Sequence, residues 1–125
     1  MKKKWMAAVL TGLLFLTGGM TASAESVSGS IGGISFTAYS SIYAGGADAG
    51  TVSSGTQISM SVSADYSYVN PISLKTGTSH QSMNRVTGAV VTFAAPTGCR
   101  SVRITASHSA DLGSEHWSGS TSATY

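Results

Sequence analysis

The chain is poor in the residues that usually fix or interrupt a small fold. It has one cysteine, two prolines and only 10% charged side chains in 125 residues. The single cysteine, Cys99, excludes an internal disulfide, so the fold must depend on its own apolar core. We interpret Cys99 as a small buried side chain beside the turn at residues 96–98, with an intermolecular or reactive thiol as the alternative.

Leucine is also scarce beyond the first 24 residues, where only Leu74 and Leu112 occur. Serine, threonine, β-branched and aromatic residues dominate there instead. This composition favours strands and argues against any sizeable helix. A regular alternation of apolar and polar residues, described below, argues against disorder of the whole segment.

The N-terminus has the three parts of a secretory signal peptide. Lys2–Lys4 are basic, residues 5–16 are apolar, and Ala22–Ala24 form a small-x-small cleavage site. We therefore predict a signal peptide over 1–24 and a single domain over 25–125, with an uncleaved anchor as the alternative. The predicted mature protein is secreted, possesses no transmembrane segment, and comes from a bacterium, as the short lysine-rich start indicates.

Removal of residues 1–24 changes the charge balance. Four basic side chains then face five acidic ones, a formal net charge of −1 in place of the +2 of the whole chain; the basic ones are Lys75, Arg85, Arg100 and Arg103. No basic footprint for nucleic acid remains. We expect neither a nucleic-acid partner nor a cofactor.

The segment from Ile58 to Tyr68 holds a two-residue period without a break. Its even-numbered positions are apolar or aromatic, and its odd-numbered positions are serine or aspartate. Successive side chains on a strand point to opposite faces, so the pattern predicts a half-buried antiparallel strand. Residues 34–43 repeat this pattern, with Tyr39 and Tyr43 on the face opposite Ile34, Phe36 and Ile42.

About six strands are expected in all. They cover residues 34–43, 57–69, 72–75, 86–94, 100–109 and 117–125. Residues 25–33 are expected to be irregular, 45–50 and 76–84 to be loops, and 53–55 to be a turn. Strand 86–94, apolar on both faces, is a candidate for the centre of a sheet, and Val102, Ile104 and Ala106 are expected to face inward. The prediction is a small antiparallel β-sandwich, with a small closed β-barrel as the alternative.

Three residues could form a weak metal site. If residues 100–109 and 115–124 form a hairpin, His108 and His116 could lie close together, with Glu115 as a third ligand. The spacing matches no zinc signature, and a strand-end histidine bonded to a neighbour is the alternative. Catalysis is not expected, because 22 serines follow residue 24, which makes a serine near a histidine uninformative, and no nucleophile elbow occurs.

Tyr39 and Tyr43 are the candidate ligand-binding residues. Outward aromatic rings among hydroxyls suit carbohydrate or protein contact, whereas cross-strand packing is the alternative reading. We therefore expect a secreted, non-catalytic protein that acts by binding a cell-surface component or by self-assembly. The alternative is a small bacteriocin-like antagonist that acts on a neighbouring cell's envelope.

Overall fold

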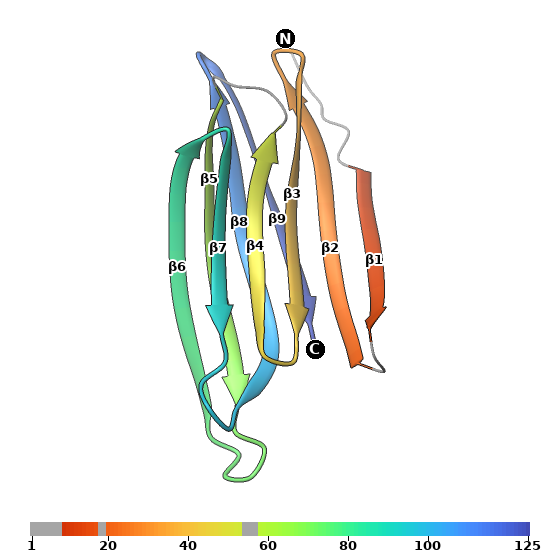
Figure 1. Cartoon of the computed structure of the whole chain (residues 1–125). Coiled ribbons are helices and arrows are strands. Elements are labelled where there is room, and N and C mark those ends of the chain that lie inside the picture. The colour runs from red at the N-terminus through yellow and green to blue at the C-terminus, as the bar shows by residue number, and fades with distance from the viewer. Residues whose placement is uncertain (1–8, 18–19, 54–57) are drawn as a thin grey trace.

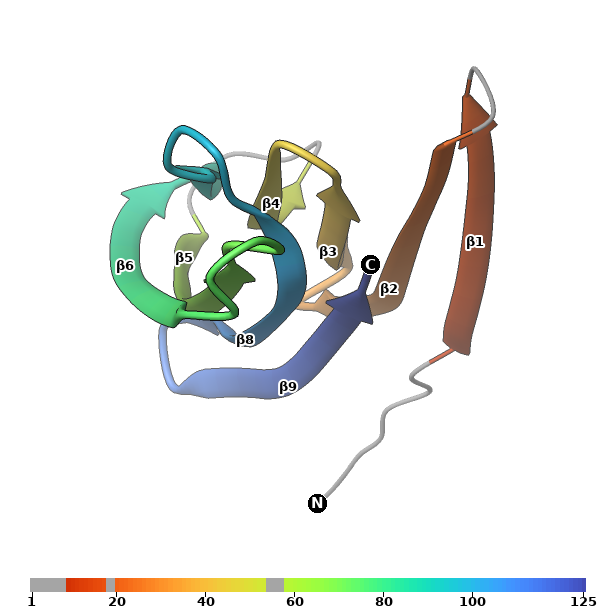
Figure 2. The same ribbon diagram turned by 90° about the horizontal axis from the view of Figure 1, so that it is seen from below.

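The protein is a sandwich of two antiparallel sheets. The computed structural model describes residues 9–17, 20–53 and 58–125, with side chains from residue 23 onward. One sheet has the order β1-β2-β3-β4-β7 and the other the order β6-β5-β8-β9, and the two do not close into a barrel (Figures 1 and 2). The strands of the described residues are β1 Val9–Thr17, β2 Met20–Ile31, β3 Ile34–Tyr43, β4 Gly46–Ser53, β5 Ser59–Val69, β6 Thr76–Val86, β7 Gly88–Ala94, β8 Arg100–Leu112 and β9 Glu115–Thr124. The predicted sandwich is confirmed.

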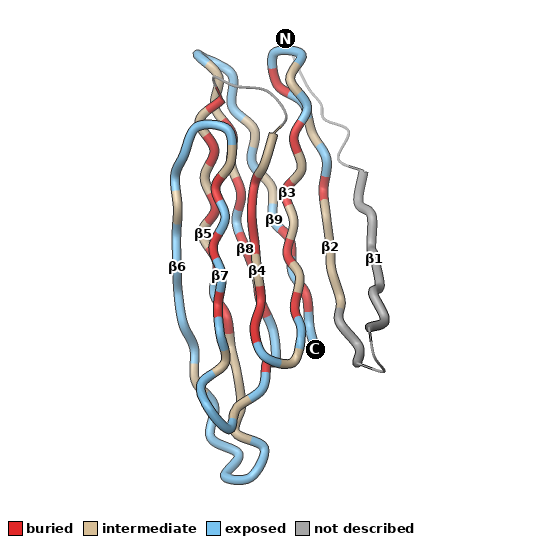
Figure 3. The backbone as a smooth tube through the Cα atoms, in the orientation of Figure 1, coloured by how far each residue is buried: buried red, intermediate tan, exposed pale blue. Residues whose placement is uncertain are grey.

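The core lies between the inward faces of the two sheets. Strand β5 contributes Met60, Val62, Ala64 and Tyr66, all buried as their alternation predicts. Strand β8 alternates over much of its length, whereas β4 is buried along most of its length (Figure 3). Tyr66 stacks on Phe93 of the opposite sheet with ring centroids 5.1 Å apart. Many other core residues are alanine, so the two sheets are joined by a few large side chains among small ones.

Two strands replace predicted loops. Residues 46–53, predicted as a flexible loop and a turn, form β4, which pairs with both β3 and β7. Residues 76–86, predicted to be a polar loop as far as 84, form the edge strand β6, which pairs with β5. The prediction of an irregular segment at residues 25–33 was also wrong, because residues 25–31 belong to β2. The other two residues of the predicted turn at 53–55 lie outside the described part of the chain.

The predicted strand at residues 72–75 is a turn instead. The Asn70 side chain accepts hydrogen bonds from the backbone N–H groups of Ile72 and Ser73, at 2.9 and 3.1 Å. Leu74 has a positive φ of 63° and donates its N–H to the Asn70 carbonyl. An Asx-type turn of this kind reverses the chain between β5 and β6, so residues 72–75 belong to no β-strand.

Two further predictions about strand position were wrong. Strand β7 lies at the edge of its sheet and not at the centre, and its outward Val90 rests beside β4. Val102 is exposed, because the register between β5 and β8 shifts at Ser67 and Tyr68. The shift puts Ser101 into the core, where the Tyr66 hydroxyl lies 2.8 Å from its Oγ, while Ile104 and Ala106 face inward as predicted.

Aromatic side chains repeatedly lie over a glycine on the neighbouring strand. In register, Phe36 pairs with Gly29, Tyr39 with Gly50, Tyr43 with Gly46 and Tyr68 with Gly77. A Cβ on Gly50 would lie 2.9 Å from Tyr39 Cε1, so the ring occupies the space that a side chain would take. Such pairs cover exposed backbone and compensate the weak strand preference of glycine.

Side chains close the two open sides of the sandwich. On one side, Gln81 Nε2 of β6 donates to the carbonyl of Thr92 on β7, at 2.7 Å. On the other, Glu25 of β2 accepts from the N–H of Ser122 on β9 at 2.6 Å, and Ser23 donates to the Thr124 carbonyl at 2.7 Å. These bonds occupy backbone groups at the edges of β7 and β9, which would otherwise be free to pair with another chain.

The predicted signal peptide overlaps described structure. Its apolar region contributes β1, which pairs with β2 from Val9↔Ser28 to Thr17↔Met20. Its basic start at Lys2–Lys4 lies outside the described residues. Cleavage after Ala24 would remove β1 and the beginning of β2, and it stays a prediction. Among the described residues no helix is long and apolar enough to cross a membrane.

Candidate functional site

The outward side of β3, β4 and β7 carries the predicted binding residues, and we call it the tyrosine face. It consists of three cross-strand rows: Tyr39–Gly50–Val90, Ser41–Asp48–Thr92 and Tyr43–Gly46–Ala94. Residues directly opposite one another in an antiparallel pair share a face. Tyr39 and Tyr43 therefore point away from the core, as predicted, with Ser41 between them.

The two tyrosines are held as separate flat platforms. Four residues of extended strand place them about 13 Å apart along β3. Tyr39 is partly covered and rests across Gly50 against Val90, whereas the Tyr43 side chain is 40% exposed and its hydroxyl lies over Gly46. Because glycine stands at both opposing positions, each ring lies close to the backbone of β4 with no side chain beneath it.

Both phenols stay protonated well above neutral pH. Burial raises the pKa of Tyr39, and the nearby Asp48 carboxylate raises it further. Burial and Asp48 raise the pKa of Tyr43 in the same way, with a smaller contribution from Tyr66. Each ring therefore presents an apolar surface and a neutral hydroxyl, with the Asp48 carboxylate and the Ser41 and Thr92 hydroxyls in the row between them.

The outward side of the other sheet differs in chemistry, and we call it the hydroxyl face. Its central rows run across β6, β5, β8 and β9: Asn84–Ser61–Ser109–Ser118, Ser82–Ser63–Ser107–Ser120 and His80–Asp65–Thr105–Ser122. Two histidine–aspartate pairs lie on this face, one within the third row and the other in the row beyond Ser109–Ser118. His80 Nδ1 lies 2.8 Å from Asp65 Oδ1, and His116 Nδ1 contacts Asp111 Oδ1 at hydrogen-bond distance. All four of these side chains are largely open to solvent.

His108 lies in the core and not on either face, with 2% of its surface exposed. Its Nδ1 is 2.9 Å from Thr51 Oγ1 and its Nε2 is 2.7 Å from Thr121 Oγ1. Thr51 donates to the Ser61 carbonyl at 3.0 Å, so its oxygen must accept from His108 Nδ1–H. Thr121 then donates to Nε2 and accepts from the Ser40 hydroxyl, with which it is in contact.

This arrangement is complete only with a neutral imidazole. Every donor is used once, in a chain that joins β3 and β4 of one sheet to β5, β8 and β9 of the other. A second ring proton would face the hydroxyl that already donates to Nε2. Accordingly, burial lowers the pKa of His108 from 6.5 to about 4. The residue works as a polar tie between the sheets.

The structure does not bring the predicted metal set together. His108 lies opposite Gly119, whereas His116 lies opposite Asp111, and the two histidines project from opposite sides of the sheet. Glu115 is exposed at the start of β9, opposite Leu112. Among the described residues, no group of three or more histidine, cysteine or carboxylate side chains could hold a metal ion.

The β5–β6 turn exposes apolar side chains at one end of the sandwich. Ile72 is 93% exposed and Leu74 is 74% exposed. Cys99 belongs to the neighbouring β7–β8 connection and is partly buried, with its N–H donated to the Pro96 carbonyl at 2.9 Å. Trp117 packs at the margin of the core, edge-on to Phe36 with ring centroids 4.7 Å apart.

Comparisons with known proteins supply no relative for this chain: no family model, curated protein or solved structure matches it. The features of the molecule that bear on its function are therefore the two outward faces and the turn between β5 and β6. Sequence reasoning identified the tyrosines but missed the two histidine–aspartate pairs. Asp65 and His80 are 15 residues apart, and only the register of β6 against β5, a strand that was not predicted, makes them neighbours.

Proposed function

We propose that this is a secreted binding protein that attaches to a carbohydrate component of the cell exterior through the tyrosine face. The carrying observation is the placement of Tyr39 and Tyr43 on one strand and one face, each lying over a glycine. Flat rings with neutral hydroxyl tips contact the apolar side of a sugar ring and bond its hydroxyls at the edge. Asp48, Ser41 and Thr92 supply further hydrogen-bonding groups between the rings.

Two of the four sheet edges, those of β7 and β9, are less open to pairing with another copy, because Gln81 and Glu25 occupy backbone groups there. The other edges are β6 and β1, with β2 in place of β1 once residues 1–24 are removed. The surface also carries few charges, so long-range attraction to a polyanion contributes little. Contact with a neutral, hydroxyl-rich polymer needs neither a basic patch nor an open sheet edge.

The experiment is co-sedimentation of the purified protein with isolated cell-wall and membrane fractions. We expect retention on the wall fraction, and loss of most of this retention in Tyr43→Ala. The matched control is Tyr125→Ala, because Tyr125 is also 40% exposed but lies at the end of the chain. Equal retention of Tyr43→Ala and the wild type, with both folded, would contradict the proposal, as would the absence of binding to any wall fraction.

The exposed β5–β6 turn favours a second candidate, an antagonist that acts on a neighbouring cell's envelope. Ile72 and Leu74 together form an apolar tip, which is the chemistry that inserts at a membrane interface. This function predicts growth inhibition of related strains and leakage from lipid vesicles. Both should disappear in the double variant Ile72→Asp/Leu74→Asp and persist in Tyr43→Ala, which separates the two candidates.

A further inference from the structure

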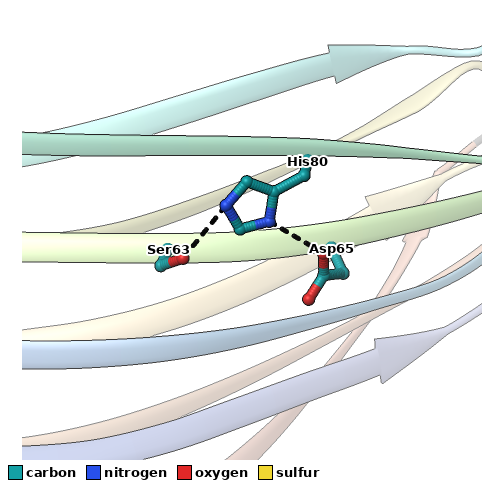
Figure 4. Close-up of polar contacts among 3 residues, drawn as sticks. All are labelled: Ser63, Asp65 and His80. Atoms are coloured by element: carbon teal, nitrogen blue, oxygen red, sulfur yellow. Dashed lines mark hydrogen bonds and ion pairs between the residues drawn. The ribbon is translucent and has the colours of Figure 1, made fainter.

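One serine of the hydroxyl face has a histidine and an aspartate in line behind it (Figure 4). Ser63 Oγ of β5 lies 3.4 Å from His80 Nε2 on β6, and His80 Nδ1 lies 2.8 Å from Asp65 Oδ1 on β5. Ionised aspartate only accepts, so His80 carries its proton on Nδ1 and turns the lone pair of Nε2 toward Ser63. This is the order of atoms by which a base activates a serine hydroxyl.

The strand geometry explains why the three side chains meet. Ser63 and Asp65 are two positions apart on β5 and so share a face, and His80 is directly opposite Asp65 in register. The other pair, Asp111–His116, offers an internal comparison. In that pair Asp111 of β8 lies between His116 on β9 and Ser59 on β5, so Ser59 is on the side of Asp111 away from the histidine ring. Of the two pairs in the described part of the chain, the β5–β6 pair is the one in which a serine hydroxyl lies near the second nitrogen of the histidine ring.

Ser63 also borders a shallow hollow between β5 and β6. The hollow has a volume of about 220 Å³ and is lined by Ser61, Val62, Ser63, Ser82, Met83 and Asn84. The side chains of Val62 and Met83 face the core, so the polar side chains of the hollow come from Ser61, Ser63, Ser82 and Asn84. Asn84 holds its amide in place by donating to Ser61 Oγ at 2.6 Å. A small acyl group next to the Ser63 hydroxyl would therefore lie near an amide donor.

From this geometry we propose that Ser63 is a nucleophile for activated acyl esters, an activity beyond the binding role and contrary to the expectation of a non-catalytic protein. The Ser63 oxygen forms a bond to the acyl carbonyl carbon while its proton passes to His80 Nε2. The bond between that carbon and the leaving group then breaks, and the leaving group takes the proton from His80. Water, deprotonated by the same nitrogen, then attacks the acyl carbon. The bond from that carbon to the Ser63 oxygen breaks, and the serine oxygen takes the proton back from His80, which releases the acid and restores both residues.

The roles differ among the three residues. Ser63 and His80 touch the reacting atoms and are the catalytic residues. Asp65 acts through His80 and is a positioning residue, because it fixes which ring nitrogen carries the proton. His80 and Asp65 are largely exposed and Ser63 is partly exposed, and charge stabilisation is weak where water has access. The rate enhancement therefore belongs at the low end of the range for general base catalysis, about 100-fold or less.

The test is acylation by p-nitrophenyl acetate and by a fluorophosphonate, with the modified residue located by mass spectrometry. The reference is Ser107, which lies opposite Ser63 on β8 and has Ser120 as its other neighbour in the row. We expect Ser63 to react at least about tenfold faster than Ser107. Ser63→Ala should abolish the fast reaction, and His80→Gln should lower it to the rate of Ser107.

Two further variants distinguish a positioning role of Asp65 from a purely structural one. Asp65→Asn should slow the reaction of Ser63, and Asp65→Glu should recover part of the rate, while both variants unfold at the wild-type temperature. His116→Gln, which alters the comparison pair, should change nothing. Equal rates at Ser63 and Ser107, or a Ser63 rate unaffected by His80→Gln, would overturn the proposal. Sedimentation with cell-wall material should be unchanged in Ser63→Ala, so the binding proposal is tested separately.

Discussion

The two outward faces of the sandwich are built from the same alternation but differ in what each strand contributes. On the tyrosine face a large ring lies opposite a glycine, so the surface is made of a few platforms over bare backbone. On the hydroxyl face side chains of similar small size stand opposite one another in rows. The first arrangement couples surface chemistry to backbone packing, whereas the second joins neighbouring side chains to one another by hydrogen bonds, as in the Asn84–Ser61 and His80–Asp65 pairs.

The largest expected effect is at Gly46, beneath Tyr43. A Cβ at Gly46 would lie 2.2 Å from the Phe93 carbonyl oxygen, a backbone atom that cannot move aside alone. Gly46→Ala should therefore lower the free energy of unfolding by more than about 3 kcal/mol. The control is Gly45→Ala, since a Cβ at Gly45 would have no atom within 4 Å. Denaturant unfolding of both variants checks this, and similar midpoints would show that the close approach of the Gly46 and Phe93 backbones does not exclude a side chain at Gly46.

The second effect concerns the hydrogen bonds of the buried His108, which join the two sheets of the sandwich. Burial lowers the pKa of His108 to about 4 in the folded protein, against about 6.5 when unfolded. Between these values the unfolded chain binds the extra proton, so this stability is complete above pH 6.5 and is lost as the pH falls toward 4. The loss should reach at most about 3 kcal/mol.

Unfolding measured from pH 7.5 to pH 4 checks this dependence. The double variant His80→Gln/His116→Gln is the control, because both of its histidines are on the solvent-exposed hydroxyl face. It should keep the same loss of stability with pH. A flat profile for the wild type would contradict the predicted role of His108, and a flat profile in this variant alone would assign the pH dependence to His80 or His116.

A smaller effect compares side chains on the two faces directly. Tyr39→Ala removes the ring that covers Gly50 and should lower the free energy of unfolding by about 1–2 kcal/mol. Ser107→Ala on the hydroxyl face should change it by less than about 0.5 kcal/mol, because an exposed hydroxyl loses little. Thermal unfolding of the pair measures the difference. Equal shifts would mean that the tyrosine is not coupled to the backbone below it.

The same contrast explains which parts of the fold could be predicted from the sequence. Strands β3 and β5 bury one face and expose the other, so their two-residue period is visible in the residues themselves. Strand β4 is a run of glycine and small residues whose partners are rings on other strands, and β6 is exposed on both sides. Neither strand shows a regular two-residue alternation, because pairing with adjacent strands, and not the local preference of its own residues, holds each one in its sheet.

The candidate sites follow the same division. Tyr39 and Tyr43 belong to a periodic strand, so their outward direction could be predicted. The pairing of His108 with His116 required the register of β8 against β9, and the observed register places the two on opposite sides. The alignment of Ser63, Asp65 and His80 required β6, a strand without any apolar pattern, so no signal in the sequence alone could have identified it.

The most direct test of the binding account compares the two faces in one assay. Tyr39→Ala/Tyr43→Ala and Ser107→Ala/Ser120→Ala each remove two outward side chains, one pair from each face. Both are sedimented with isolated cell-wall polysaccharide after their folding is confirmed by circular dichroism. The account predicts that the tyrosine variant stays in the supernatant and the serine variant sediments like the wild type. Sedimentation of the tyrosine variant together with loss of the serine variant would contradict it and assign binding to the hydroxyl face.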